Sequence, residues 1–536
     1  MKTEIKHIVY LMLENRSLDQ LLGWLYDEKN PPLVNIPPQD KDKKPTYNGL
    51  KENTYYNLDE DCNKHYVIKG VDNMNVPIHD PHEKYSHVNK QLFDTEDNQS
   101  CDTKATMRGF YKDFATYHDN DDHVDQIMQT YTPEDLPVLN GLAKAFAVSD
   151  RYFCSVPTQT NCNRAFAAAG NSVNINKQNE PEAFVNNRKF SHKLGHLSQP
   201  FGNLFSQNTM WNVLWEHGFR EPSDWMHYYS TGRDWERWLG LEGYTYTRDL
   251  MTQLHPKKFN KHFDGMAVFF ENAKAGKLPR FSFLEPEWGL EIPVLGIDVG
   301  AQGTDYHPPT NLIPGETFVK KVYDSLTSNK DAWANTLLII NFDEHGGTYD
   351  HVGPTPCATA PWANASDGTP TPTETNRELG FDFKRFGVRV PLLLVSPRIQ
   401  ESTVFRAEGD IPYDHTSVIA TILKMFEIPK TAWQLGSRTA NAPTFENIFE
   451  GNPVRQDIPV VEVNKHPKTI EDIATKTPPN DIHLQVAHNI LYRFIKKEGL
   501  SKDDIDKLDL PKLVDAENAL HLSTLLKAAV NTIRNR

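Results

Sequence analysis

Three stretches of the chain are apolar at nearly every position and contain several β-branched residues. They are residues 7–13 (HIVYLML), 336–342 (TLLIINF) and 388–397 (VRVPLLLVSP). A strand that is buried on both faces has this continuous pattern, because neither face meets water. We therefore predict a β-strand near the centre of a sheet in each of the three stretches.

Segments with the spacing of amphipathic helices lie between and after these strands. They are residues 136–148, 162–170, 315–326 and 415–426. Buried strands that alternate with such helices are typical of α/β folds with a central, mostly parallel sheet. We predict that fold class.

The character of the sequence changes at about residue 430. Residues 1–430 carry the predicted strands and helices and form one main domain, whereas residues 431–536 are predicted to be a mainly helical C-terminal appendage. Within the main domain, the polar composition of residues 27–105 indicates a long insertion at the rim of a site. Residues 354–376 predict a loop rich in Pro, Thr and Ala.

In residues 481–500 the apolar positions fall on one face of a helix, with Asp481 as the predicted N-cap. These apolar residues are Ile482, Val486, Ile490, Leu491, Phe494 and Ile495. The remaining charges have mixed sign, which favours a helix that packs on the protein over one that lies on a membrane surface.

The charge balance excludes one class of function. The chain has 57 Lys and Arg against 71 Asp and Glu, a formal net charge of −14. Without a broad basic surface we expect no nucleic-acid binding and, at most, transient contact with an anionic membrane. Phosphate chemistry would need local positive charge from a metal ion or from histidine.

The N-terminus and the cysteines bear on location. The apolar stretch 8–13 is too short for a secretory signal, and no segment approaches the roughly 20 apolar residues of a transmembrane helix. We therefore expect a cytoplasmic protein, or one exported by another route. The five cysteines contain no CxxC motif, which favours free thiols, although a Cys62–Cys101 disulfide stays open.

Oxygen-bearing side chains directly follow two of the predicted strands. Glu14 and Asn15 come after residues 7–13, and Asp343 and Glu344 come after residues 336–342. Ligands of open parallel sheets collect at the carboxyl ends of the strands, so we expect these four side chains to meet. Carboxylates that repel each other are stable together around a cation, so the sequence predicts a metal site.

A candidate nucleophile stands at the start of a predicted helix. Thr160 precedes the alanine-rich stretch 162–170, and Asn161, Asn163 and Arg164 add amide and guanidinium donors for a phosphate. The alternative is that the threonine is only an N-cap, which is its commonest role at such a position.

Histidines recur beside carboxylates in predicted loops. They are His79, His82 and His87 in HDPHEKYSH, His307 beside Asp305, His351 beside Asp350, and His415 beside Asp414. Oriented imidazoles of this kind protonate leaving groups or bind phosphoryl oxygens.

Together these motifs resemble the phosphoesterase family of bacterial and plant non-specific phospholipases C and a respiratory-burst-inhibiting acid phosphatase. The resemblance spans residues 4–430 or so. It rests on Glu14-Asn15-Arg16-Ser17, YTPEDLPVLNGLAKAFAVSDRYFCSVP, the Thr-x-x-Asn-Arg element at Thr160, DYHPP, FDEHGGTYDHV, GVRVPLLLVSP and YDHTS. One departure is Cys162, where the family commonly has proline.

The resemblance implies an alkaline phosphatase-like α/β/α sandwich, with residues 1–430 as the catalytic domain. It implies that Glu14, Asn15, Asp343 and Glu344 bind one divalent ion, with Thr160 as nucleophile and further metal contact. It also implies an active-site position for His82, Asp305, His307, Asp350 and His351. Ligands that are all oxygen favour a hard cation such as Ca²⁺, with Zn²⁺ as the alternative.

The implied chemistry is a two-step displacement at phosphorus through a phosphothreonine, with His307 or His351 protonating the leaving alcohol. The leading interpretation is a phospholipase C that acts on phosphatidylcholine or similar lipids. A phosphomonoesterase with the same site is the alternative, and an inactive binding protein on this fold is a third. The aromatic segment 210–245 favours a lipid substrate, although ordinary core packing explains it equally well.

Overall fold

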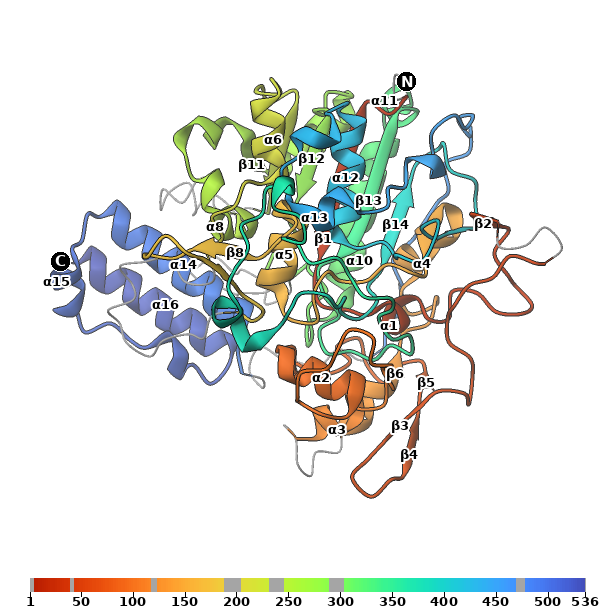
Figure 1. Ribbon diagram of the computed structural model, residues 1–536, viewed down its shortest axis with the longest axis horizontal. Helices are drawn as coiled ribbons and strands as arrows, with labels where there is room; N and C mark the ends of the chain where they lie inside the picture. The colour runs from red at the N-terminus through yellow and green to blue at the C-terminus, as the bar shows by residue number, and fades with distance from the viewer. Residues whose placement is uncertain are drawn as a thin grey trace.

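Nine strands within the described residues form the central sheet (Figure 1). The computed structural model describes residues 4–38, 43–116, 123–187, 204–230, 245–288, 303–468 and 478–535. Across the sheet the strands run in the order β11-β10-β12-β1-β13-β14-β7-β15-β2. Their bounds are Phe263–Gly265, Trp225–Tyr229, Phe281–Leu284, His7–Leu13, Thr336–Phe342, Leu392–Val395, Ala147–Ser149, Thr403–Phe405 and Val34–Ile36 in that order.

Neighbouring strands of this sheet are parallel except at β14, which runs antiparallel to both β13 and β7. The strands predicted at 7–13 and 336–342 are confirmed at those bounds. The strand predicted at 388–397 starts only at Leu392, because Pro391 lacks the N–H that a ladder position needs. The predicted α/β class with a mostly parallel sheet is confirmed.

The helices between residues 137 and 440 include two packed groups. In one, α10 contacts α4 and α9; in the other, α12 contacts α5, α6 and α13. The bounds are Leu312–Thr327 (α10), Pro137–Ala145 (α4), Met266–Ala275 (α9), His415–Met425 (α12), Thr160–Ala169 (α5), Met210–Glu216 (α6) and Gly436–Ala440 (α13). The helix predicted at 136–148 is too long, since it ends at Ala145 and the chain then enters β7.

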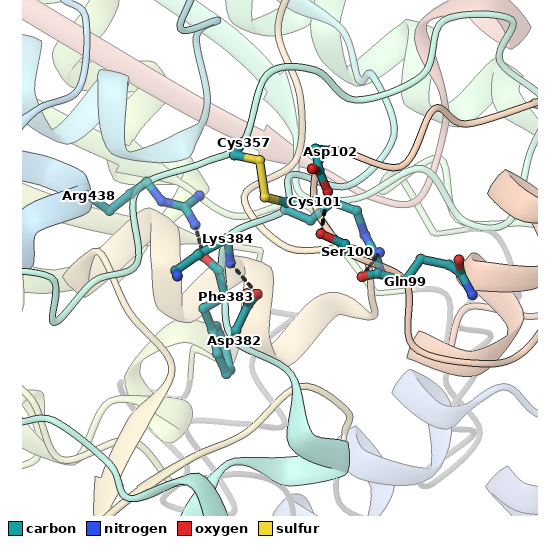
Figure 2. Close-up of a disulfide and its surroundings, with 10 residues drawn as sticks. Gln99, Ser100, Cys101, Asp102, Cys357, Asp382, Phe383, Lys384 and Arg438 are labelled. Atoms are coloured by element: carbon teal, nitrogen blue, oxygen red, sulfur yellow. Dashed lines mark hydrogen bonds between the residues drawn. A yellow bond between two sulfur atoms is a disulfide. The ribbon is translucent and has the colours of Figure 1, made fainter.

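The polar insertion predicted at 27–105 carries short strands and one helix at the bottom of the view in Figure 1. These elements are β3 (Tyr56–Leu58), β4 (Lys64–Tyr66), β5 (Ile68–Lys69) and α2 (Tyr85–Phe93). Figure 2 shows that Cys101, near the end of the insertion, forms a disulfide with Cys357 of the 354–376 loop; the two Cα atoms are 5.1 Å apart. The free-thiol prediction is wrong for this pair, and the open Cys62–Cys101 pairing is wrong as well. Cys62, Cys154 and Cys162 are free thiols.

The C-terminal region is helical, as predicted. Its helices are α14 (Asp481–Lys497), α15 (Lys502–Asp506) and α16 (Ala519–Arg534), and α14 packs on α16. The N-cap of α14 is Asn480, whose Oδ1 accepts from His483 N at 2.8 Å, and not the predicted Asp481. The six apolar residues of the predicted face are all buried, as in a packing helix. None of the described helices is long and apolar enough to cross a lipid bilayer.

Candidate active site

The ends of β1 and β13 bring two pairs of polar side chains together. The strands pair in parallel with Leu13 opposite Phe342, so Glu14 and Asp343 follow at neighbouring positions. Glu14, Asn15, Asp343 and Glu344 are all fully buried. The Asn15 backbone N–H donates to Asp343 Oδ1 at 3.2 Å, which ties one strand end to the other.

A glycine after Glu344 permits this close approach. Gly346 has a φ of +58°, and a Cβ at this position would lie 2.1 Å from the carbonyl oxygen of Asn15. Any side chain would therefore push the Asn15 loop away from Glu344, and only glycine adopts this φ at little cost. The Gly346 N–H also donates to Glu344 Oε2 at 2.8 Å, which orients that carboxylate.

Helix α5 supplies a hydroxyl and a guanidinium to the same cluster. Thr160, its first residue, donates from Oγ1 to Glu14 Oε2 at 3.2 Å and lies 3.4 Å from Asn15 Oδ1. Arg164 lies one turn further along the same helix face, where residues four apart are neighbours. Its Nε is 2.7 Å from Glu14 Oε1 and 3.1 Å from Asp343 Oδ2. Arg164 was predicted to bind phosphate, yet its present contacts are with the carboxylates.

The cluster carries more negative than positive charge. Burial raises the pKa of Glu14 well above its usual range, and Asp343 adds to that rise while Arg164 opposes it. Burial and the Asp343 charge raise the pKa of Glu344 in the same way. The Glu344 carboxylate is fully buried, and the Glu83 side chain lies beside it and opposes the rise in its pKa. Several buried carboxylates with only one guanidinium, and an amide oxygen beside them, are a donor set that fits a divalent cation.

The structure adds two carboxylates that the sequence analysis missed. Glu83, from the polar insertion, accepts from Asn15 Nδ2 at 2.6 Å and lies 3.5 Å from His307 Nε2. Asp80 lies 3.7 Å from His307 Nδ1. The prediction favoured their neighbour His82, because a histidine beside prolines is a stronger signal than an acidic residue in a polar loop. The His82 imidazole instead faces Asp113, 3.6 Å away.

His307, a predicted site residue, lies beside this cluster. Burial lowers its pKa to about 3, so the ring is neutral. Its Nδ1 lies 2.6 Å from the carbonyl oxygen of Pro308, which fixes a proton on Nδ1 and leaves Nε2 as an acceptor. Asp305, also a predicted site residue, holds the loop that carries His307 against Glu14. Its backbone oxygen accepts from Glu14 N at 2.7 Å, and its Oδ1 accepts from His307 N at 3.3 Å.

Two predicted catalytic residues, Asp350 and His351, belong to a separate buried network. Asp350 Oδ1 accepts from Arg389 Nε at 2.9 Å, and His351 Nδ1 lies 2.6 Å from Asp19 Oδ2. Arg389 also donates to Asp19 Oδ1 at 2.9 Å. These contacts hold the loop after β13 onto the start of α1 (Leu18–Leu22). Their contacts are with Arg389 and Asp19, and their active-site role stays a prediction.

The amides predicted to bind phosphate are engaged elsewhere. Asn163 accepts from Val156 N at 3.1 Å and donates to the Thr158 carbonyl at 2.8 Å, so it braces the loop before α5. Asn161 accepts from the Tyr246 hydroxyl at 2.6 Å and donates to Gln485 Oε1 at 3.1 Å.

The C-terminal region therefore reaches the site, which the sequence did not predict. Gln485 of α14 holds the residue that follows Thr160, and Asn480 Nδ2 lies 3.1 Å from His307 Nδ1. Both side chains are buried.

The aromatic segment 210–245 is only partly described. Trp211 and Trp225 are fully buried and pack around His227, as core residues do. Trp235 and Trp238 lie outside the described residues. The described part therefore supports the core-packing interpretation over a lipid-contact surface.

Comparisons with known proteins identify the family of this chain. The profile of the Phosphoesterase family matches residues 5–429. The chain is 32% identical over 463 residues to non-specific phospholipase C1 of Arabidopsis thaliana, covering 85% of this chain and 73% of that protein. It is 24% identical over 486 residues to phospholipase C B of Mycobacterium tuberculosis, covering 87% of this chain and 82% of that protein. A solved structure from Vibrio parahaemolyticus is described as a protein in the alkaline phosphatase superfamily. It matches 69% of this chain and 82% of that chain, with a TM-score of 0.29 and 12% identity, and this similarity is too weak to carry an argument.

Proposed function

The chain belongs to the phosphoesterase family and is a phosphoric ester hydrolase, and we propose that it is a phospholipase C. In this proposal it hydrolyses glycerophospholipids such as phosphatidylcholine to diacylglycerol and a phosphorylated head group. The similar proteins from Arabidopsis thaliana and Mycobacterium tuberculosis, which are named phospholipases C, support the diester substrate. The observation that carries the proposal is the position of Thr160 Oγ1, 3.2 Å from Glu14 Oε2 at the N-terminus of α5.

Thr160 is the nucleophile in this proposal. Its hydroxyl proton leaves toward Glu14 Oε2 as Oγ1 forms a bond to phosphorus, and the bond from phosphorus to the diacylglycerol oxygen breaks. The N-terminal end of α5 favours the negative charge of the phosphoryl group. A divalent cation held by Glu14, Asn15, Asp343 and Glu344, with Ca²⁺ favoured over Zn²⁺ by the oxygen donors, supplies Lewis-acid stabilisation of the phosphoryl oxygens.

His307 and Glu83 are the proposed acid–base pair. Because the neutral His307 ring carries no proton on Nε2, the Glu83 carboxyl, whose Oε1 lies 3.5 Å from Nε2, supplies the proton that passes to the departing diacylglycerol oxygen. In the second step His307 Nε2 takes a proton from water as the water oxygen attacks phosphorus. The bond from phosphorus to Thr160 Oγ1 then breaks, Glu14 Oε2 returns its proton to Oγ1, and the head-group phosphate leaves.

The test compares a diester with a monoester on one preparation. The purified protein is assayed for diacylglycerol release from phosphatidylcholine vesicles and for hydrolysis of p-nitrophenyl phosphate, before and after dialysis against EDTA and with Ca²⁺ or Zn²⁺ restored. The proposal predicts faster turnover of the lipid and loss of activity on chelation. Preferential hydrolysis of the monoester would assign a phosphatase instead, and activity that survives complete chelation would contradict the metal-dependent site.

A matched pair of variants isolates the nucleophile. Thr160→Ala removes the attacking oxygen and should lower kcat by at least about 10³-fold. Thr158→Ala is the control, because Thr158 is equally buried on the same loop but donates to Asn186 Oδ1 at 3.1 Å. Equal activity losses in the two variants would indicate a folding defect and not a missing nucleophile.

A further inference from the structure

A second group of metal-ligand side chains is made of residues other than those of the Thr160 cluster. It comprises His82 in the loop before α2, His87 in α2 and Asp113 in α3 (Phe110–Ala115). One ligand atom from each residue lies within 4.8 Å of the others. His87 Nδ1 is 2.7 Å and His82 Nδ1 is 3.6 Å from the same atom, Asp113 Oδ1. Helices α2 and α3 pack on each other, which brings His87 to Asp113.

The carboxylate of this group is held in place from behind. The Asp113 side chain is 1% exposed, and its Oδ2 accepts from Gln91 Nε2 at 2.8 Å. Gln91 Oε1 in turn lies 2.8 Å from His345 Nε2. With Oδ2 engaged, Oδ1 faces the two imidazoles. Metal sites in proteins orient their ligand carboxylates by outer hydrogen bonds of this kind.

The two histidines leave one side of the group open. Their side chains are 16% and 25% exposed for His82 and His87, so an ion can enter from solvent and keep a water ligand. The two rings are tilted by 31° relative to each other, with their centroids 3.9 Å apart. An ion pair with Asp113 needs only one histidine, and two protonated rings at that distance would repel each other. Two neutral imidazoles and a carboxylate around a cation have no such conflict.

We propose that His82, His87 and Asp113 bind a divalent ion of the Zn²⁺ class, separate from the cation held by Glu14 and Asp343. Two imidazole nitrogens and one carboxylate suit Zn²⁺, Co²⁺ or Ni²⁺, whereas the oxygen donors of the Thr160 cluster suit a hard cation. Among the described residues the site has three protein ligands, and its two histidines are partly exposed to solvent. Through Gln91 it also braces His345, the residue after Glu344, so an ion here would fix the loop at the carboxyl end of β13.

The test is a metal titration and does not depend on enzymatic activity. Protein dialysed against EDTA is titrated with Zn²⁺ by calorimetry in excess Ca²⁺, and with Co²⁺ followed by its visible absorption. The wild type should bind one Zn²⁺ per chain at this site and give the absorption of Co²⁺ with nitrogen ligands. The same signal should persist in Glu344→Gln, so a failure of the proposed phospholipase chemistry would leave this result intact.

Variants separate a metal site from a simple hydrogen-bonded pair. His87→Gln keeps a donor for Asp113 but removes the imidazole, and it should weaken Zn²⁺ binding by at least about 100-fold; His82→Ala should do the same. His79→Ala, three residues before His82, is the matched control and should bind as the wild type does. Circular dichroism verifies that each variant is folded. Wild-type Zn²⁺ affinity in His87→Gln and His82→Ala, or an equal loss in His79→Ala, would overturn the proposal.

Discussion

Replacing Arg164 by methionine tests how the charges of the candidate site are balanced. Arg164 contacts Glu14 Oε1 at 2.7 Å and Asp343 Oδ2 at 3.1 Å, and all three side chains are 0% exposed. Removing one partner of a buried ion pair costs about 3–5 kcal/mol, because the remaining charges stay buried without a counter-ion. Methionine fills most of the same volume, so little of this loss comes from a cavity.

The charge count also predicts how a cation changes that loss. The single guanidinium of Arg164 contacts Glu14 and Asp343, and the carboxyl groups of Glu344 and Glu83 belong to the same cluster, so a divalent cation can compensate the remaining negative charge. A bound cation compensates the charge of the carboxylates that Arg164 otherwise compensates. The stability deficit of Arg164→Met should therefore be largest in EDTA and smaller in saturating Ca²⁺.

Urea unfolding followed by tryptophan fluorescence measures both values. Lys320→Met is the control, because Lys320 pairs with Asp324 at 2.7 Å on an exposed helix face. Such pairs contribute about 0.3–0.5 kcal/mol, and Ca²⁺ should not change that figure. An Arg164→Met protein as stable as the wild type in EDTA, or a deficit that Ca²⁺ leaves unchanged, would refute the reasoning.

Three further predictions concern other parts of the molecule. Burial keeps the pKa of His227 well below 6.5, so the unfolded chain takes up a proton that the folded chain does not, and stability present above pH 6.5 is lost as the pH falls. The free energy of unfolding of His227→Phe, relative to that of the wild type, should rise by about 2 kcal/mol between pH 8 and pH 5 when measured by denaturant unfolding. Parallel dependence of the two unfolding free energies on pH would contradict this. Gln485→Leu should lower kcat roughly tenfold with little change in KM, because Gln485 holds Asn161 beside Thr160, and Gln485→Glu should restore most of the rate by keeping the acceptor oxygen. Cys101→Ser should lower the free energy of unfolding by about 2–5 kcal/mol and abolish any further effect of dithiothreitol; an unchanged midpoint would show that the disulfide is not formed in solution.

The strands that carry the site could be predicted from the sequence, because burial on both faces leaves them apolar at most positions, with Thr336 and Asn341 as the buried polar exceptions in β13. The direction of β14 could not, since an antiparallel strand buried on both faces has the same apolar pattern. The disulfide could not be predicted either, because Cys101 and Cys357 are 256 residues apart and cysteine spacing does not determine pairing.

The candidate site was predictable where it directly follows a buried strand or begins a helix. Glu14, Asp343 and Thr160 meet for that reason. Asp350 shares a motif with Asp343, but it pairs with Arg389, and nothing in the local sequence indicates that partner. Glu83 was missed because its place at the site depends on the path of a long polar insertion, which no periodicity encodes.

The central claim is that Thr160 attacks phosphorus, and trapping the intermediate tests it most directly. The metal-loaded enzyme is mixed with phosphatidylcholine, quenched in acid within one turnover, digested and analysed by peptide mass spectrometry. The account predicts a phosphocholine adduct on the peptide that contains Thr160, absent from Thr160→Ala. An adduct on a different residue, or full turnover by Thr160→Ala, would contradict it.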